Sequence, residues 1–129
     1  MLQRNYQQQY QKMQVETASP GELTLLLYQE IIKSLLNAKD LFSREKYQEM
    51  REPIYKAQRI INELIITLDM EHEISHQLYQ LYHYHNRRLA DFLLKKDLLI
   101  LEEVITFARE ITETWKQALA ILKSGVSRV

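Results

Sequence analysis

The sequence contains no cysteine, which excludes disulfide bonds, thiolate metal sites and cysteine nucleophiles. Only two glycines and two prolines occur among its 129 residues. Glycine supplies tight turns and close approaches of the backbone to a ligand, and a sheet needs a turn every few residues. The scarcity of both residues therefore predicts long helices joined by short connections.

An excess of one charge and long apolar runs are missing as well. The 17 basic residues are balanced by 17 acidic ones, so the chain lacks the basic excess of a dedicated nucleic-acid binder. No stretch approaches the roughly 18 apolar residues of a membrane span. The polar segment 1–14 also lacks the apolar run of a signal peptide. We therefore expect a single domain in the cytoplasm.

The first strong helical signal is Ser19-Pro20-Gly21-Glu22. Serine caps a helix, proline suits its first turn, and a glutamate three residues after the serine completes a capping box. A helix is predicted over 20–42, and its inward seam is Leu23, Leu27, Ile31, Ser34, Ala38 and Leu41. Because further residues such as Leu25 and Tyr28 widen the apolar arc, this helix either is central or presents a second face to a partner.

Three further segments show the three-and-four apolar spacing of packed helices. The first spans 44–68, where Pro53 predicts either a kink or a separate first turn, because an internal proline removes one hydrogen bond. The second begins between 70 and 75 and ends near 95. Its predicted inward seam is Ile74, Leu78, Leu81, His85, Leu89 or Arg88, and Phe92. The third spans 97–123.

These segments predict an all-α fold. Because the connections are too short for crossovers, an antiparallel up-down-up-down four-helix bundle is expected over 19–124. Residues 1–18 are rich in glutamine and carry a thin apolar stripe that includes Tyr6 and Tyr10. They form an N-terminal arm that is either mobile or a short cap helix. Residues 125–129 form a C-terminal tail.

One pattern suggests metal chemistry. His72, Glu73 and His76 belong to H-E-x-x-H, in which two histidines one helical turn apart bind zinc and the glutamate activates water. A catalytic zinc also needs a third protein ligand and a substrate cleft. We therefore interpret the pattern as a solvated junction between helices and predict no catalytic residue, no metal site and no cofactor. A metal-dependent enzyme stays a minor alternative.

Basic residues gather toward the end of the third predicted helix, at Arg87, Arg88, Lys95 and Lys96. Such a group is usually a solvated face. The alternative is a docking edge for acidic residues of a partner, where Arg88 suits a carboxylate because its guanidinium donates two parallel hydrogen bonds.

Tyrosines lie among the leucines of the first and third predicted helices, at Tyr28, Tyr79, Tyr82 and Tyr84. Tyrosine suits an interface because its ring is apolar while its hydroxyl keeps a polar partner. A position at the edge of an ordinary core explains these residues equally well.

Several blocks follow one another along the whole chain: TASPGEL at 17–23, Leu27-Tyr28, KAQRIINEL at 56–64, LYHYHNRRL at 81–89, Lys96-Asp97 and TWKQAL at 114–119. Their combination resembles the flagellin export chaperone family. In that family such a cap opens the first bundle helix, a tyrosine-rich stretch before two arginines marks the third, and Trp-Lys-Gln marks the fourth. The chain departs from the family pattern at His83, His85 and Asn86.

The resemblance implies a helical bundle that binds the disordered C-terminal segment of newly made flagellin in the cytoplasm. It also implies that this binding blocks premature filament assembly and keeps the cargo competent for flagellar type III export. Further implied partners are the flagellar export apparatus and, as an option, a co-chaperone. The residues that match the motifs are candidates for the cargo face or its support: Leu23, Leu27, Tyr28, Tyr82, Arg88 and Leu89. The arm that carries Tyr6 and Tyr10 would cover part of the bundle and give way to cargo.

A second function class is compatible with the same sequence. A general helical adaptor that binds another folded protein would also use a wide apolar helix. It differs from an export chaperone because it needs no disordered cargo.

Overall fold

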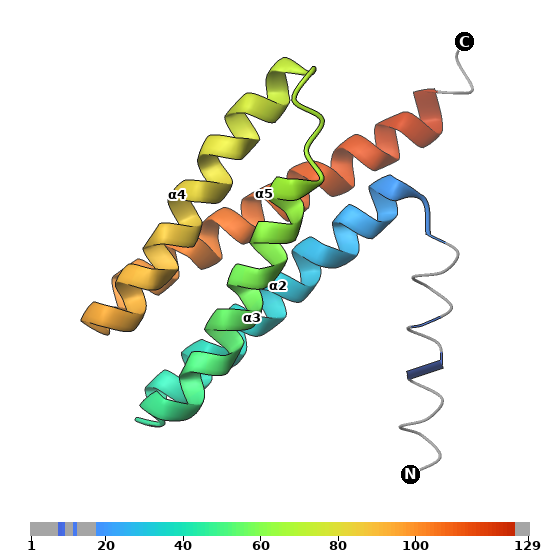
Figure 1. The fold of residues 1–129 in the computed structure, drawn as a ribbon. Helices are drawn as coiled ribbons and strands as arrows, with labels where there is room; N and C mark the ends of the chain where they lie inside the picture. The colour runs from blue at the N-terminus through green and yellow to red at the C-terminus, as the bar shows by residue number, and fades with distance from the viewer. Residues whose placement is uncertain (1–7, 10–11, 13–17, 126–129) are drawn as a thin grey trace.

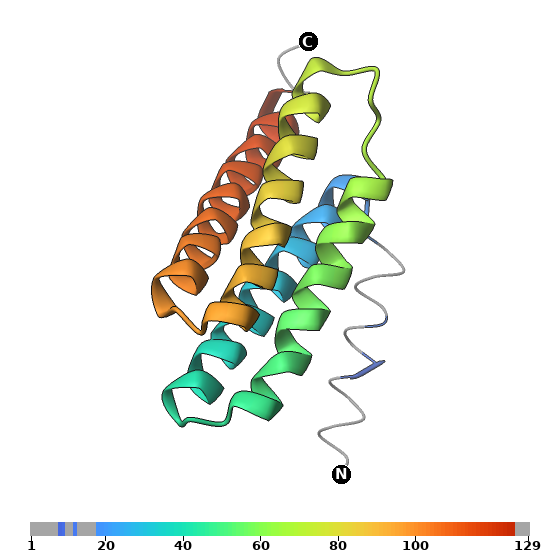
Figure 2. The same ribbon diagram turned by 60° about the vertical axis from the view of Figure 1, so that its left-hand side comes forward.

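The computed structural model describes residues 8–9, 12 and 18–125. This part of the chain contains four helices and no strand: α2 (Pro20–Ser43), α3 (Tyr47–Ile66), α4 (Glu73–Lys95) and α5 (Leu98–Gly125). The helices run alternately in opposite directions along one bundle, as Figure 1 and Figure 2 show from two sides. The predicted all-α, up-down-up-down four-helix bundle is therefore confirmed.

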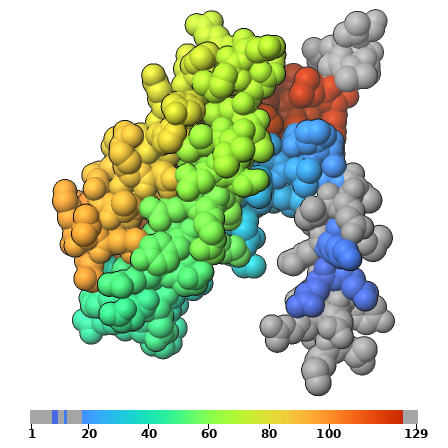
Figure 3. All heavy atoms as spheres, viewed as in Figure 1, coloured from blue at the N-terminus to red at the C-terminus, as the bar shows by residue number. Residues whose placement is uncertain are grey.

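The helices pack as a ring in which each has two main neighbours. α2 packs on α3 and α5, and α4 packs on the same two helices. α2 and α4 therefore lie diagonally across the bundle, as do α3 and α5. One face of the bundle is formed by α2 and α5, and the opposite face by α3 and α4, which lie side by side at the front of Figure 3.

α2 begins where the sequence predicts. The Ser19 side chain accepts a hydrogen bond from the backbone N–H of Glu22 at 3.2 Å, and Pro20 occupies the first turn. The cap satisfies a backbone donor that has no partner within the helix. This end of α2 is the one on which the candidate site depends.

Two of the connections between helices are tight turns, and neither uses glycine. Glu45, between α2 and α3, has a φ of 57°, and Lys96, at the C-cap of α4, has a φ of 51°. The Lys96 N–H donates to the carbonyl of Phe92 at 2.7 Å, which closes the last turn of α4. The connection from α3 to α4 is longer and spans residues 67–72.

Pro53 lies inside α3, which runs as one helix from Tyr47 to Ile66. The expectation of a separate first turn before Pro53 is therefore wrong. The Pro53 side chain is buried, and the packing of its ring offsets the hydrogen bond that proline cannot donate. The predicted start near 44 is also early, because residues 44–46 form the turn from α2.

The core draws apolar side chains from all four helices. The largest fully buried side chains are Phe92, Leu35, Met50, Ile54, Ile61, Leu89, Leu101 and Val104. On α3 the apolar residues at three-and-four spacing are buried: Met50, Ile54, Ala57, Ile61 and Leu64. The seam predicted for α2 is partly wrong, because Tyr28 and Leu35 are buried outside it, whereas Leu23, Leu27 and Leu41 are only partly buried. Within residues 8–9, 12 and 18–125, no helix combines the length and the apolar character that a bilayer crossing requires.

The inward seam predicted for α4 is partly wrong. Ile74 is 59 % exposed and Leu81 is 43 % exposed, whereas their neighbours Ser75 and Tyr82 are buried. The helix is therefore turned by about one residue, or 100°, from the expected orientation over its first half. The physical reason is the Tyr82 hydroxyl, which finds a partner inside the bundle, as described below.

Most of the N-terminal arm lies outside the residues that the structure describes. Tyr6 and Tyr10 lie outside the described residues, so their predicted stripe stays a prediction. Of the arm before Ala18, the structure describes Gln8, Gln9 and Lys12, which are helical and exposed.

Leu35 and Leu36 offer a matched test of the core. Leu35 is 0 % exposed and Leu36 is 37 % exposed. Because truncation of a buried leucine leaves a cavity, Leu35→Ala should lower the free energy of unfolding by about 2–5 kcal/mol. Leu36→Ala should lower it by less than about 1 kcal/mol. Urea denaturation followed by circular dichroism measures both, and equal losses would contradict the assigned orientation of α2.

Candidate functional site

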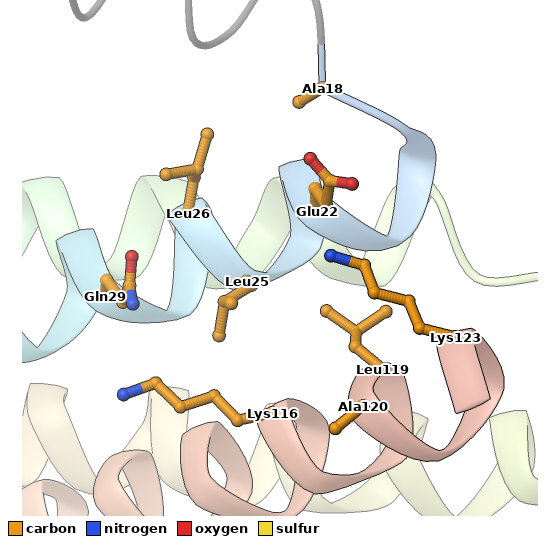
Figure 4. A pocket seen from close by; sticks show the side chains of 9 residues that line it. All are labelled: Ala18, Glu22, Leu25, Leu26, Gln29, Lys116, Leu119, Ala120 and Lys123. Carbon is orange, nitrogen blue, oxygen red and sulfur yellow. The ribbon is translucent and has the colours of Figure 1, made fainter.

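An open groove lies between the N-terminal end of α2 and the C-terminal end of α5. Its volume is about 390 Å³, and its lining residues are Ala18, Glu22, Leu25, Leu26, Gln29, Lys116, Leu119, Ala120 and Lys123. Figure 4 shows Leu25 of α2 and Leu119 of α5 pointing into the space between the helices, with Lys116 and Lys123 of α5 beside them. The groove therefore has an apolar interior and a charged rim.

The first turns of α2 are apolar on nearly every side. Leu23, Leu25, Leu26 and Leu27 follow one another almost without interruption, and each is only partly buried. A helix that is apolar all round is normally enclosed by other elements. Here the bundle encloses it incompletely, so apolar surface remains for another chain to cover.

Gly21 allows α2 and α5 to approach closely at the edge of the groove. A Cβ atom at this position would lie 2.8 Å from the Leu119 Cδ2 atom, closer than ordinary van der Waals contact allows. The Gly21 carbonyl also accepts a hydrogen bond from Trp115 Nε1 at 2.8 Å. The hydrogen bond from Trp115 thus ties the first turn of α2 to α5 at the edge of the groove.

A pair of buried tyrosines extends this contact across the bundle. The Trp115 ring meets Tyr28 edge-on at 6.1 Å between ring centroids, and the Tyr28 hydroxyl shares a hydrogen bond of 2.5 Å with that of Tyr82. Burial, and next the bond to Tyr82, raise the pKa of Tyr28, and burial raises the pKa of Tyr82, so both stay protonated. One chain of contacts therefore joins α5, α2 and α4.

A second polar cluster joins α4 to α5. Arg88 Nε donates to Glu103 Oε1 at 2.8 Å and Nη1 donates to Asp91 Oδ2 at 3.1 Å, while the Tyr84 hydroxyl donates to Glu103 Oε2 at 2.8 Å. The hydrogen bond from Arg88 lowers the pKa of Glu103, and the bond to Glu103 raises the pKa of Tyr84. Arg88 already holds two carboxylates of its own chain, which limits its use by a partner.

His85 is a buried base between these two clusters. Its ring stacks on Phe107 with 3.9 Å between centroids, and its Nδ1 atom has no hydrogen-bond partner within the described chain. Burial lowers the pKa of His85, and the nearby Arg88 guanidinium lowers it further, against the opposite influence of Glu103. The imidazole is therefore held neutral in the α4–α5 interface.

The sequence-based candidates fall into two groups in the structure. Leu23 and Leu27 are partly exposed on α2 near the groove. The others are enclosed: Tyr28, Tyr82 and Leu89 are buried and Arg88 is ion-paired. Two alternative roles were predicted for these residues, direct contact with cargo or support of the cargo face. For the enclosed residues, only the supporting role agrees with their burial. Neither role is tested by the structure alone.

The groove itself was missed because its two walls come from distant segments. The sequence predicts for Leu25 only a place in a wide apolar arc, and it contains Lys116 and Leu119 only within the TWKQAL block at 114–119. The usable signal was that the TASPGEL and TWKQAL blocks lie at the ends of antiparallel first and fourth helices, which meet at the same end of the bundle.

The H-E-x-x-H pattern is not assembled on one helix. His72 precedes α4 as its N-cap residue, with an extended ψ of 137°, and its Nε2 lies 3.5 Å from Asp69 Oδ2. His72 and His76 are therefore not one helical turn apart. Within the described ranges, no three histidine or carboxylate side chains gather where they could hold a metal ion.

A helical bundle with an apolar groove and a charged rim is typical of proteins that bind a segment of another protein. The comparisons with known proteins agree with this class. The family model described as "Flagellar protein FliS" matches residues 2–122. The chain therefore belongs to the FliS family.

Three curated relatives show the extent of the similarity. The flagellar secretion chaperone FliS of Bacillus subtilis (strain 168) is 37 % identical over 110 residues, covering 85 % of this chain and 83 % of the relative. FliS of Escherichia coli (strain K12) is 34 % identical over 109 residues, covering 81 % and 79 %. The flagellar secretion chaperone FliSB of Pseudomonas aeruginosa is 33 % identical over 114 residues, covering 87 % and 90 %.

The tyrosine pair predicts a strong coupling between two distant residues. Tyr28→Phe or Tyr82→Phe leaves one buried hydroxyl without its partner, so each should lower the free energy of unfolding by about 1–3 kcal/mol. The double variant should lose clearly less than the sum, because no orphaned hydroxyl remains. Urea denaturation of the four proteins provides the cycle, and additive losses would disprove the coupling.

His85 predicts a pH dependence of stability. Its folded-state pKa lies below the ordinary imidazole value of ~6.5, so the unfolded chain binds the proton first as pH falls. The free energy of unfolding should therefore decrease from about pH 7 toward pH 5. In His85→Gln this slope should be shallower, whereas the exposed His76→Gln should keep it. Urea denaturation across this pH range measures the slope, and identical slopes in all three proteins would refute the assignment.

Proposed function

We propose that this chain is a cytoplasmic flagellar secretion chaperone that binds the C-terminal segment of flagellin. Binding prevents premature polymerisation of flagellin and keeps it competent for flagellar type III export, with the flagellar export apparatus as the next partner. The family membership and the names of the relatives support the chaperone function. The observation that carries the cargo-binding part is the incompletely covered apolar end of α2 beside the groove.

The energetics require a surface larger than the groove. Fixing the backbone of ~20 cargo residues at ~1.5 kcal/mol each costs ~30 kcal/mol. At ~25 cal/mol per Å², burial of ~1,200 Å² of apolar surface offsets this cost. A groove of about 390 Å³ holds only a few side chains. The cargo must therefore continue along neighbouring parts of the bundle.

Further apolar side chains are exposed at the same end of the bundle as the groove. They come from the end of α3, the connection to α4, the start of α4 and the end of α5, which Figure 1 shows together: Ile66, Met70, Ile74, Ile121 and Leu122. An extended cargo that leaves the groove meets these residues next. Such wrapping suits a segment that is unfolded before it binds, since a folded partner covers a compact patch.

The N-terminal arm is well placed to compete with cargo. Ala18, where the continuous described chain begins, lines the groove. The arm therefore enters the bundle at the edge of the apolar surface. In our proposal the arm, with Tyr6 and Tyr10, covers part of this surface in the free chaperone and is displaced by flagellin.

Leu26 and Leu119 test the groove directly. Aspartate at either position places a charge that an apolar cargo side chain would have to desolvate. We expect Leu26→Asp and Leu119→Asp each to weaken binding of a flagellin C-terminal fragment at least ~10-fold in titration calorimetry. The matched control is Leu99→Asp, because Leu99 is 77 % exposed at the opposite end of α5. It should bind like the unchanged protein.

Circular dichroism of the same mixtures distinguishes the chaperone from a general adaptor. A disordered cargo should gain helical signal on binding, so the mixture should exceed the sum of its parts. Unchanged affinity in both groove variants, with the bundle folded, would contradict the groove. Absence of a helical gain would favour the adaptor that binds a folded partner.

A further inference from the structure

A second surface lies on the face of the bundle opposite the groove. α3 and α4 are held together there by Asn86. Its side-chain Nδ2 donates to Asn62 Oδ1 at 2.9 Å, and its backbone carbonyl accepts from Gln58 Nε2 at 3.3 Å. The exposed or partly exposed side chains around this seam define what we call the α3–α4 face: Arg51, Tyr55, Tyr79, His83, Arg87 and Leu94. Figure 3 shows these two helices side by side at the front of the molecule.

The α3–α4 face has no carboxylate in its central part, although the whole chain is electrically neutral. Residues 74–90 of α4 and 53–62 of α3 contain neither aspartate nor glutamate. Of the carboxylates that flank these stretches, Glu52 pairs with Arg59 at 3.1 Å and Asp91 pairs with Arg88 at 3.1 Å. The other two, Glu63 and Glu73, lie at the end of the face next to the α3–α4 connection. The acidic residues that balance the total charge lie elsewhere.

The two arginines of this face differ from most others in the described chain, of which only Arg109 on α5 also has no ion pair. Arg44, Arg59 and Arg88 each form an ion pair with a carboxylate. Arg51 and Arg87 form no such pair with any residue that the structure describes. Their guanidinium groups are therefore open to carboxylates from outside the chain, and each can bind one carboxylate by donating two parallel hydrogen bonds.

Aromatic and apolar side chains accompany the two arginines along α4. Tyr79 and His83 pack their rings 4.4 Å apart, and with Arg87 they line a shallow depression of about 350 Å³. Leu94, which is 82 % exposed, stands beyond Arg87 on the same helix. Tyrosine and arginine are the residues most often found at the energetic centre of protein interfaces.

We propose that the α3–α4 face is a second docking surface, which binds an acidic amphipathic segment of another protein. Carboxylates of that segment pair with Arg51 and Arg87, while its apolar side chains pack on Tyr55, Tyr79 and Leu94. The surface is opposite the α2–α5 groove, so the segment binds without displacing a groove occupant.

Charge complementarity of this kind sets the rate and salt dependence of association. Exposed arginines attract an acidic partner over about 10 Å at moderate ionic strength, and added salt screens the attraction. The affinity of the α3–α4 face should therefore fall as salt is raised. Binding in the apolar groove should change much less over the same range.

The experiment uses the full chain labelled with ¹⁵N and a synthetic helical peptide. The peptide carries leucines at three- and four-residue spacing and glutamates elsewhere; a second peptide has lysine in place of every glutamate. The acidic peptide should shift backbone amide signals of 51–66 and 79–94, leave those of 22–29 and 116–123 unchanged, and bind more weakly in high salt. The lysine peptide should shift neither set.

A charge-reversed variant makes the assignment specific. Arg51→Glu with Arg87→Glu should weaken binding of the acidic peptide at least ~10-fold. Lys33→Glu with Arg109→Glu makes the same change in net charge on α2 and α5, and should have much less effect. The first variant should also keep its affinity for the flagellin C-terminal fragment, which separates this surface from the groove.

Four outcomes would overturn the proposal. One is an acidic peptide that shifts no signal on α3 and α4. Another is a set of shifts confined to the groove, which would assign the anion preference to Lys116 and Lys123. The third is equal weakening by both charge-reversed variants, which would reduce the effect to net charge. The fourth is a loss of flagellin binding in Arg51→Glu with Arg87→Glu, which would mean that flagellin also binds to the α3–α4 face and that the two surfaces are not separate.

Discussion

The hydrogen bond between the hydroxyls of Tyr28 and Tyr82 is the constraint on which the rest of the bundle depends. It joins α2 to α4, the two helices that lie diagonally opposite each other. Because a buried hydroxyl without a partner is costly, both rings must point to the centre, and this sets the rotation of both helices. The rotation of α2 turns Leu25 toward α5, and that of α4 leaves Ile74 outside the core.

The groove depends on the same constraint through Trp115. Its ring packs on Tyr28, and its Nε1 donates to the Gly21 carbonyl, so the end of α2 is held against α5 by a polar contact. Apolar side chains of α2 are then free to remain partly uncovered, because they are not what fixes the helix in place. The division between residues that position the helix and residues that offer surface explains why the motif tyrosines are buried while the leucines beside them are not.

Periodicity alone is sufficient for α3, because its seam consists of apolar residues whose burial needs no specific partner. On α2 it finds Ile31, Ser34 and Ala38 but not Tyr28, which is buried through a hydrogen bond to another helix. It failed for α4, where Leu78 and Leu81 compete with Tyr82 for the inward position and a hydroxyl on a distant helix decides the outcome. The same limit applies to the groove, since no local pattern states that Leu25 and Leu119 face each other. For the H-E-x-x-H pattern the deciding feature is the start of α4, which the sequence places only between 70 and 75: because the helix begins at Glu73, His72 lies outside it and the two histidines do not share a helical turn.

The turns at Glu45 and Lys96 have a consequence for engineering this scaffold. Both residues adopt a left-handed backbone conformation that costs a residue with a side chain roughly 1–2 kcal/mol, and that glycine adopts almost freely. Both lie at the end of the bundle far from the groove. Glycine at these two loop positions would therefore raise the thermal stability of the bundle without altering the groove.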